Sequence, residues 1–222
     1  MDDRLDARRV AERTVYEGRV VGLRIETVEF ADGSRSEREI VHHPGAVAIV
    51  ALDGDEVVLV RQHRAPAQRI LLEIPAGTRD PRPDGTVEDP ALTATRELAE
   101  EAGLRAATWR HLATFWTAPG FATETMDLYL ATDLATAGDG QAAEDERIAV
   151  ERVNWRRAVE MVDEGEIADA KSIVGILWLA RLMERGAIDQ GGAAHGERAP
   201  SREPWPPPGG DGRARDRTGP GA

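Results

Sequence analysis

Three carboxylates lie close together in one short segment of the chain, and their spacing favours a divalent metal ion. The segment reads Arg96-Glu97-Leu98-Ala99-Glu100-Glu101-Ala102-Gly103-Leu104. On an α-helix each residue advances by about 100°, so Glu97, Glu100 and Glu101 would share one face within an arc of about 100°. Like charges four residues apart destabilise a helix by about 0.2–0.5 kcal/mol per pair, so we expect a cation over this face. Oxygen ligands suit Mg²⁺, with Mn²⁺ as a substitute, because these hard ions keep water molecules and take substrate phosphates as further ligands.

The alternative interpretation is that these glutamates form the solvated face of an acidic helix, as many charged runs do. The flanking residues define the helix itself. Asp89 is a good N-cap and Pro90 suits a first turn, while Gly103 is a natural stop. The sequence therefore predicts a helix over Pro90–Ala102. Small and apolar residues on the opposite side are expected to pack closely on a sheet: Ala91, Ala94, Leu98 and Ala102.

The same segment resembles the signature of Nudix hydrolases. That signature is a glycine, five residues, Glu, seven residues, and then Arg-Glu-apolar-any-Glu-Glu-any-Gly-apolar. Glu88, followed after seven residues by Arg96, fits it. The departure lies in front, because ten residues rather than five separate Gly77 from Glu88. Residues 78–87, which include two prolines and a glycine, are therefore interpreted as a lengthened loop.

Three flanking segments resemble the ADP-ribose pyrophosphatase branch of that family. They are Leu72-Glu73-Ile74-Pro75-Ala76-Gly77, Val60-Arg61-Gln62-His63-Arg64, and Ala118-Pro119-Gly120-Phe121 followed by Glu124. The resemblance covers about residues 13–185. It implies an α+β Nudix fold, with a mixed β-sheet sandwiched between helices. It also implies Mg²⁺-dependent hydrolysis of ADP-ribose to AMP and ribose 5-phosphate.

The resemblance further implies roles for particular residues. The metal ligands would be the backbone carbonyl of Ala76 and the carboxylates of Glu97, Glu100 and Glu101, with Glu100 also counted among the catalytic residues. A second acidic cluster, Glu144-Asp145-Glu146, is similar to the loop that supplies the water-activating glutamate in this branch. The spacing does not choose between Glu144 and Glu146, and an acidic loop can also be simply solvated.

Substrate recognition is expected from two arginines and one glutamate. Arg61 and Arg64 could contact phosphate or the terminal ribose, or be ordinary surface charges, and Glu124 could accept hydrogen bonds from ribose hydroxyls. Arg96 is expected to pair with Glu88 or with a helix glutamate and so to hold the carboxylates in place. The candidates for stacking on adenine are equally good core residues: Tyr16, Phe30, Trp116 and Phe121.

Composition narrows the function classes. The net charge of -12 argues against nonspecific binding to nucleic acid. The chain of 222 residues has no cysteine, which excludes disulfides and thiolate chemistry. Lys171 is the only lysine, so lysine catalysis is not expected. Without a run of about 18 apolar residues or a signal-like N-terminus, no membrane association is expected, and the cytoplasm is the default location.

The expected organisation has four parts. Residues 1–12 form a flexible N-terminus, 13–43 a small N-terminal β-section, 44–188 the Nudix domain, and 189–222 a disordered Gly/Pro/Arg-rich tail. The β-section would be a poor core alone and would expose strand edges, so we expect it to pair across a homodimer. The resemblance implies the same. The expected strands are 15–21, 23–30, 35–41, 46–52, 57–61, 70–74, 109–116, 126–131 and 150–155, and two further helices are expected at 157–164 and 169–186.

Two other functions stay open. The first is a Nudix pyrophosphatase acting on another nucleoside diphosphate derivative, a nucleotide sugar or a dinucleotide. The second is a noncatalytic ADP-ribose-binding sensor that regulates transcription. The intact glutamates, the acidic charge and the lack of a helix-turn-helix pattern outside the core count against the sensor.

Overall fold

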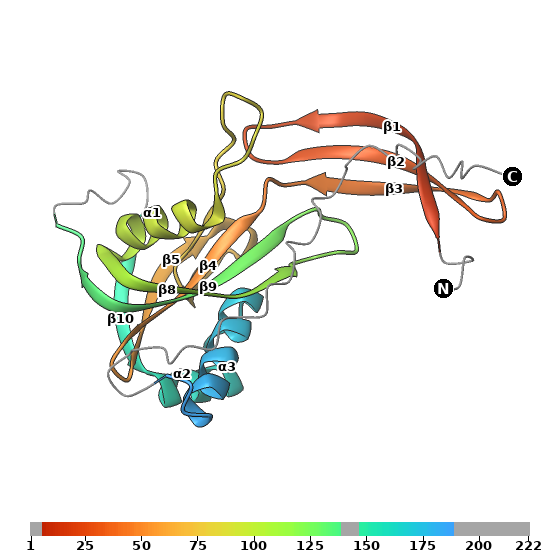
Figure 1. Cartoon of the computed structure of the whole chain (residues 1–222). Helices are drawn as coiled ribbons and strands as arrows, with labels where there is room; N and C mark the ends of the chain where they lie inside the picture. The colour runs from red at the N-terminus through yellow and green to blue at the C-terminus, as the bar shows by residue number, and fades with distance from the viewer. Residues whose placement is uncertain (1–5, 139–146, 189–222) are drawn as a thin grey trace, which may run out of the picture.

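The structure is a computed structural model, and it describes residues 6–138 and 147–188 (Figure 1). In this part of the chain, two sheets and three helices form the architecture. The helices are α1 (Pro90–Ala102), α2 (Trp155–Asp163) and α3 (Ala170–Glu184). The strands of the larger sheet are β4 (Ala46–Asp53), β5 (Glu56–Arg64), β6 (Arg69–Glu73), β7 (Ala76–Thr78), β8 (Leu104–Trp116), β9 (Thr125–Thr136) and β10 (Ala149–Asn154). Those of the smaller sheet are β1 (Ala7–Glu17), β2 (Gly22–Phe30) and β3 (Arg35–His42).

The larger sheet is mixed and lies between helices, as expected. Its strand order is β10-β5-β4-β9-β8, with β6 beside β5 and β7 beside β4. Strand β4 runs parallel to β9, whereas its pairings with β5 and β7 are antiparallel. Because its first seven residues are apolar, β4 can be buried on both faces. Val50 packs with residues of α2 and α3, and Ile49 packs with α1, so the helices cover opposite faces (Figure 1).

Helix α1 has the predicted bounds. The Asp89 Oδ1 atom accepts hydrogen bonds from the amides of Ala91 (2.9 Å) and Leu92 (3.4 Å). Gly103 ends the helix with a positive φ of 64°. Ala91, expected on the packed face, is exposed. The buried face is rotated toward the carboxylates and consists of Thr93, Ala94, Glu97, Leu98 and Glu101.

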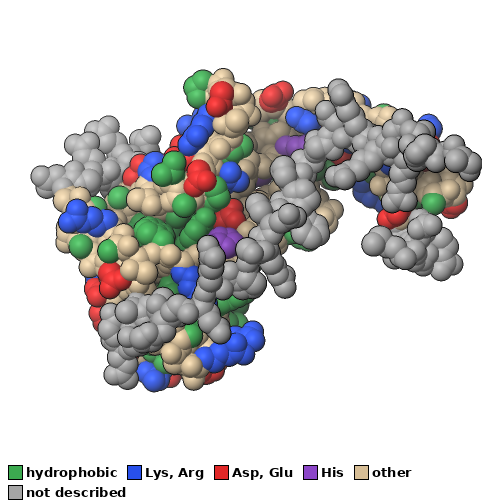
Figure 2. Space-filling model, in the orientation of Figure 1, with side chains coloured by type: hydrophobic (Ala, Val, Ile, Leu, Met, Phe, Trp, Pro, Cys, Tyr) green, Lys and Arg blue, Asp and Glu red, His purple; other side chains and the backbone are tan. Residues whose placement is uncertain are grey.

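The smaller sheet, β1-β2-β3, forms an arm that extends away from the body of the molecule (Figures 1 and 2). Its first strand begins at Ala7, so the prediction that residues 1–12 are a flexible N-terminus is wrong for residues 7–12. Cross-strand ion pairs accompany this pairing, among them Arg9 with Glu26 (3.1 Å) and Arg24 with Glu12 (3.0 Å). Because residues 7–12 do not alternate between apolar and polar types, the sequence pattern does not predict this part of β1.

Two backbone hydrogen bonds tie the arm to the body. The Val41 amide donates to the Phe121 carbonyl (2.7 Å), and the Thr123 amide donates to the Val41 carbonyl (2.9 Å). The end of β3 is therefore fixed against the loop that precedes Glu124.

Strand β7 is not among the strands expected from the sequence. Its three residues pair with β4, with Ala76 opposite Ala48. Ala76 and Gly77 therefore lie on the sheet beneath α1.

None of the helices in the described residues combines the length and the apolar character needed to cross a membrane.

Candidate active site

Two of the helix carboxylates face a cavity. Glu97 and Glu101 are only 9% and 6% exposed, so the interpretation of a wholly solvated face is wrong for both. They line a cavity of about 440 Å³ together with Ala76, Gly77 and Arg64. A buried carboxylate is costly unless it is paired with a charge or binds a metal ion. This cavity is therefore the candidate active site.

Strand β7 fixes both carboxylates. A Cβ atom at position 77 would lie 1.9 Å from Cδ of Glu97, so Glu97 needs the glycine there. Oε2 of Glu101 accepts a hydrogen bond from the Ala76 amide (2.8 Å), and its Oε1 accepts one from Nε2 of Gln62 (3.3 Å). The helix and the short strand thus define one rigid wall of the cavity.

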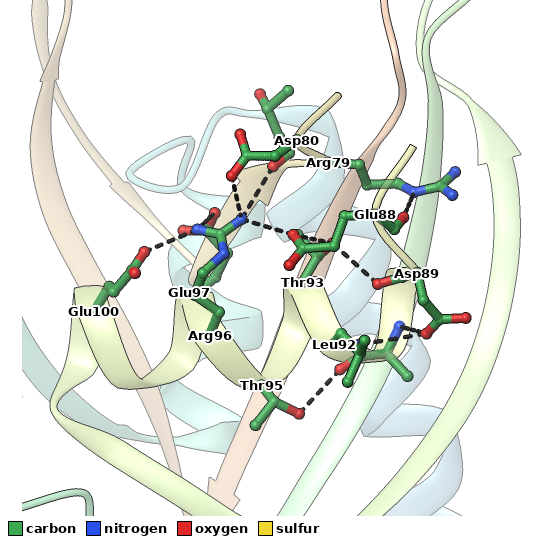
Figure 3. Close-up of polar contacts among 12 residues, drawn as sticks. Arg79, Asp80, Glu88, Asp89, Leu92, Thr93, Thr95, Arg96, Glu97 and Glu100 are labelled. Atoms are coloured by element: carbon green, nitrogen blue, oxygen red, sulfur yellow. Dashed lines mark hydrogen bonds and ion pairs between the residues drawn. The ribbon is translucent and has the colours of Figure 1, made fainter. Parts of the chain in front are cut away.

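Arg96 organises the acidic groups around it, as expected. Its Nη1 donates to Oε1 of Glu97 (2.7 Å) and to Oε2 of Glu100 (2.8 Å), and its Nη2 donates to Oε2 of Glu88 (3.1 Å). Figure 3 shows the guanidinium among these carboxylates, with Asp80 on the same side. Partial burial acts to lower the pKa of Arg96, but the hydrogen bond with Glu88 and the charge of Glu97 raise it overall. Arg96 therefore stays a cation.

Glu88 anchors the loop that precedes α1. Its Oε2 also accepts a hydrogen bond from the Thr93 hydroxyl (2.9 Å), and its backbone carbonyl accepts one from Nε of Arg79 (2.8 Å). Burial acts to raise the pKa of Glu88, but the hydrogen bonds from Arg96 and Thr93 lower it overall. Glu88 is therefore a structural anion, and the longer spacing from Gly77 leaves its contact with Arg96 intact.

The donor set fits a hard divalent ion that keeps most of its water. Glu97, Glu101 and Ala76 line the same cavity, whereas Glu100 is turned to Arg96 and is not among its lining residues. Among residues 6–138 and 147–188, no three acidic or histidine side chains are gathered closely enough to hold an ion by themselves. Two carboxylates with water and substrate phosphates are the usual environment of Mg²⁺.

The predicted substrate residues separate into two groups. Arg64 lines the carboxylate cavity and also a neighbouring cavity of about 300 Å³, which Glu124 lines too. Oε2 of Glu124 accepts a hydrogen bond from the Thr117 hydroxyl (2.5 Å). Arg61 lines neither cavity and is paired with Glu151 of β10. The structure thus brings Arg64 and Glu124 together and leaves Arg61 on the surface.

His43 lies beside Glu124, with 3.5 Å between its Nδ1 and Oε1 of the carboxylate. Burial lowers the pKa of His43, although the charge of Glu124 acts in the opposite direction. Nδ1 also accepts a hydrogen bond from the Gly45 amide (3.1 Å).

A third cavity, of about 340 Å³, lies where the arm meets the body. Tyr16 lines it and is 57% exposed. Pro81 of the lengthened loop lines both this cavity and the carboxylate cavity. Phe30, Trp116 and Phe121 line none of the three cavities.

Sequence reasoning missed two charged residues here. Glu73 is 2% exposed and lies between Arg64 and Lys171, with Oε2 2.8 Å from Nη2 of the arginine and Oε1 3.1 Å from Nζ of the lysine. The sequence signal that could have indicated Glu73 is its position as an acidic residue directly after the apolar run of residues 70–72.

Glu144 and Glu146, the candidates for the water-activating residue, lie outside the described residues, as does the tail of residues 189–222.

Comparisons with known proteins agree with this site. The chain matches the NUDIX domain family over residues 41–174. It is 37% identical to the ADP-ribose pyrophosphatase of Bacillus subtilis (strain 168) over 177 residues, which are 79% of this chain and 93% of that protein. It is 39% identical to the ADP-ribose pyrophosphatase of Mycobacterium tuberculosis over 176 residues, 78% of this chain and 82% of that protein. The crystal structure of an ADP compounds hydrolase has the same fold, with a TM-score of 0.72, 21% identity, and coverage of 85% of this chain and 100% of that one.

The fold, the buried carboxylate pair and these relatives define a hydrolase of pyrophosphate bonds. The chain belongs to the NUDIX family, which confirms the resemblance found from Glu88 to Leu104. Nudix hydrolases generally use divalent metal ions.

Proposed function

We propose that this Nudix hydrolase cleaves the pyrophosphate bond of ADP-ribose in the presence of Mg²⁺, giving AMP and ribose 5-phosphate. The observation that carries the proposal is the burial of Glu97 and Glu101 against one cavity that Arg64 also lines. Two relatives that share 37% and 39% of their residues with this chain bear the name ADP-ribose pyrophosphatase.

The chemistry of the bond explains the residue types. A pyrophosphate linkage is anionic and repels a nucleophile, and a bound divalent ion would offset that charge and lower the pKa of water. Glu97, Glu101 and the Ala76 carbonyl would hold the ion. Glu100, which does not line the cavity, would be a further, outer carboxylate ligand. Arg64 would contact phosphate and Glu124 would accept hydrogen bonds from the terminal ribose. Either Glu144 or Glu146 would take the proton of the attacking water.

We also propose a cytoplasmic homodimer in which the arm closes the site of the partner. The arm exposes apolar side chains, with Tyr16 57% and Val15 49% exposed, and it has open strand edges. A second copy that covered these edges would also complete the cavity beside Tyr16.

A hydrolysis panel tests the proposed activity. ADP-ribose, NADH, GDP-mannose and diadenosine polyphosphates are each incubated with Mg²⁺ or Mn²⁺, and the products are separated by chromatography. We expect the highest kcat/KM for ADP-ribose, with AMP and ribose 5-phosphate as products. A higher value for GDP-mannose or a dinucleotide would favour the alternative substrates. Binding of ADP-ribose without hydrolysis would favour the sensor.

A further inference from the structure

A chain of ion pairs around the buried Glu73 connects the start of α3 to Arg64. Glu73, at the end of β6, is 2% exposed. Its Oε2 accepts a hydrogen bond from Nε of Arg64 (2.8 Å) and lies 2.8 Å from Nη2 of the same arginine. Its Oε1 lies 3.1 Å from Nζ of Lys171, which in turn lies 2.8 Å from Oδ1 of Asp169. The order of charges is therefore arginine, glutamate, lysine, aspartate.

The lysine end of this chain lies at the capped first turn of α3. Asp169 is the N-cap of α3, and its Oδ1 also accepts a hydrogen bond from the Ser172 amide (3.2 Å). The Ser172 hydroxyl accepts one from the Ile74 amide (2.9 Å), directly after Glu73. The residue after β6 and the first turn of α3 are thereby joined beside the two ion pairs of Lys171.

The residue type at position 171 is distinctive for this chain. Lysine and arginine together number 28, and Lys171 is the only lysine. An ammonium is a compact point charge, whereas a guanidinium is a planar fork that prefers paired contacts. The compact group suits a place between two carboxylates, one at 2.8 Å and the other at 3.1 Å.

Arg64 is the end of the chain that reaches the candidate active site. Its side chain is 36% exposed and lines both the carboxylate cavity and the cavity with Glu124. The Nε and Nη2 edge is occupied by Glu73, which sets the direction of the remaining Nη1 edge. Glu73 thus orients the guanidinium. Glu73, Lys171 and Asp169 also line the cavity with Glu124, but of these four charged residues Arg64 alone lines the carboxylate cavity as well.

We propose that Glu73 and Lys171 are positioning residues that hold Arg64 ready for a substrate phosphate. Lys171 occupies one oxygen of Glu73 and balances its charge, so that Arg64 pairs with the other oxygen and still attracts a phosphate. Without Lys171, the whole charge of Glu73 acts on Arg64, and the buried carboxylate competes with substrate. The inference rests on the proposed contact of Arg64 with the pyrophosphate.

Kinetics of the full-length protein with Mg²⁺ and ADP-ribose test this coupling. We expect Lys171→Met to lower kcat/KM by about 10-fold or more, mainly through a higher KM. In an Arg64→Ala background the same change should alter kcat/KM by less than about 2-fold, because Lys171 acts through Arg64. Fully additive losses in the double variant would overturn the proposal. Arg157→Met, which removes three exposed ion pairs of an α2 residue, is the control and should leave kcat/KM unchanged.

A charge-neutral variant separates positioning from folding. Lys171→Met removes one of the two positive charges beside the buried carboxylate of Glu73 and is expected to lower Tm. Glu73→Gln combined with Lys171→Met removes both charges, and we expect Tm to recover while kcat/KM stays low. Recovery of both quantities would show a purely structural role and overturn the proposal.

The single lysine also allows a spectroscopic test that does not depend on turnover. Protein labelled with ¹⁵N in the lysine side chain gives one ammonium signal. Adding a nonhydrolysable α,β-methylene analogue of ADP-ribose with Mg²⁺ should shift this signal, and Arg64→Ala should abolish the shift. An unchanged signal with the analogue bound to the wild type, shown by calorimetry, would overturn the proposal. If the wild type failed to hydrolyse ADP-ribose, that would contradict the proposed function instead, and the coupling would be measured on the panel substrate it does cleave.

Discussion

At the scale of single residues, Glu97 occupies the space that a side chain at position 77 would need. The carboxylate of Glu97 lies where a side chain at position 77 would begin, since Cδ is 1.9 Å from the ideal Cβ position. Gly77→Ala should therefore displace Glu97 without breaking the sheet. We expect kcat to fall by up to about 100-fold, as for an ångström-scale misplacement of a catalytic group. Gly120→Ala, where a Cβ meets nothing within 4 Å, is the control for an added methyl group. Equal activity of both variants would contradict the assignment.

The pairing of Glu88 with Arg96 predicts a pH-dependent contribution to stability. Because the pKa of Glu88 is lowered in the fold, its stabilising contribution is present above its unfolded pKa and is lost as pH falls through its folded pKa. Glu88→Gln should lower the free energy of unfolding at pH 7, and the difference from the wild type should shrink as pH is lowered toward 3. Urea unfolding at several pH values measures this. A difference that does not vary with pH would contradict the ion pair.

Glu144 and Glu146 are separated by comparing their glutamine variants. The variant that loses the general base should keep its affinity for metal and substrate and lose kcat, because that group acts in the transition state. A variant that loses a metal-assisting carboxylate should be partly rescued by more Mg²⁺. If both variants turned over ADP-ribose at the wild-type rate, the loop would be a solvated acidic segment.

At the scale of elements, local sequence signals predict α1. They do not predict β7 or the first half of β1, which form through pairing with other strands. The bounds of α1 followed from Asp89, Pro90 and Gly103, which act on the backbone next to them. Strand β7 has three residues and exists because it pairs with β4, and no local pattern indicates such a strand. The first half of β1 pairs with β2, and ion pairs such as that of Arg9 with Glu26 cross this pairing.

Within the candidate site, the residues predicted best are those in the glutamate segment. Glu97 and Glu101 could be found from spacing alone, and the burial that distinguishes them from Glu100 could not. Glu73 and Lys171 are far apart in sequence, and only the fold places the start of α3 beside the end of β6. From the sequence, Lys171 is therefore recognisable only as the single lysine.

At the scale of the whole molecule, the arm formed by β1, β2 and β3 is the feature that favours a dimer. We expect the full-length protein to be a dimer by light scattering, and deletion of residues 1–41 to abolish the dimer and ADP-ribose hydrolysis together. Open strand edges and exposed apolar side chains on the arm are the physical reason. Deletion of residues 190–222 should leave mass, Tm and turnover nearly unchanged. A monomeric full-length protein with full activity would contradict the shared site but not the metal chemistry.

The most direct test of the central claim is the turnover of Glu97→Gln and Glu101→Gln at saturating Mg²⁺. Each variant removes one carboxylate charge and keeps the shape of the side chain, so the fold should be retained, as checked by Tm. We expect kcat for ADP-ribose to fall by at least ~100-fold in each, because the loss removes a metal ligand. Glu160→Gln, on the exposed face of α2, is the matched control. Near wild-type kcat in Glu97→Gln and Glu101→Gln would contradict the claim that these buried glutamates hold the catalytic metal.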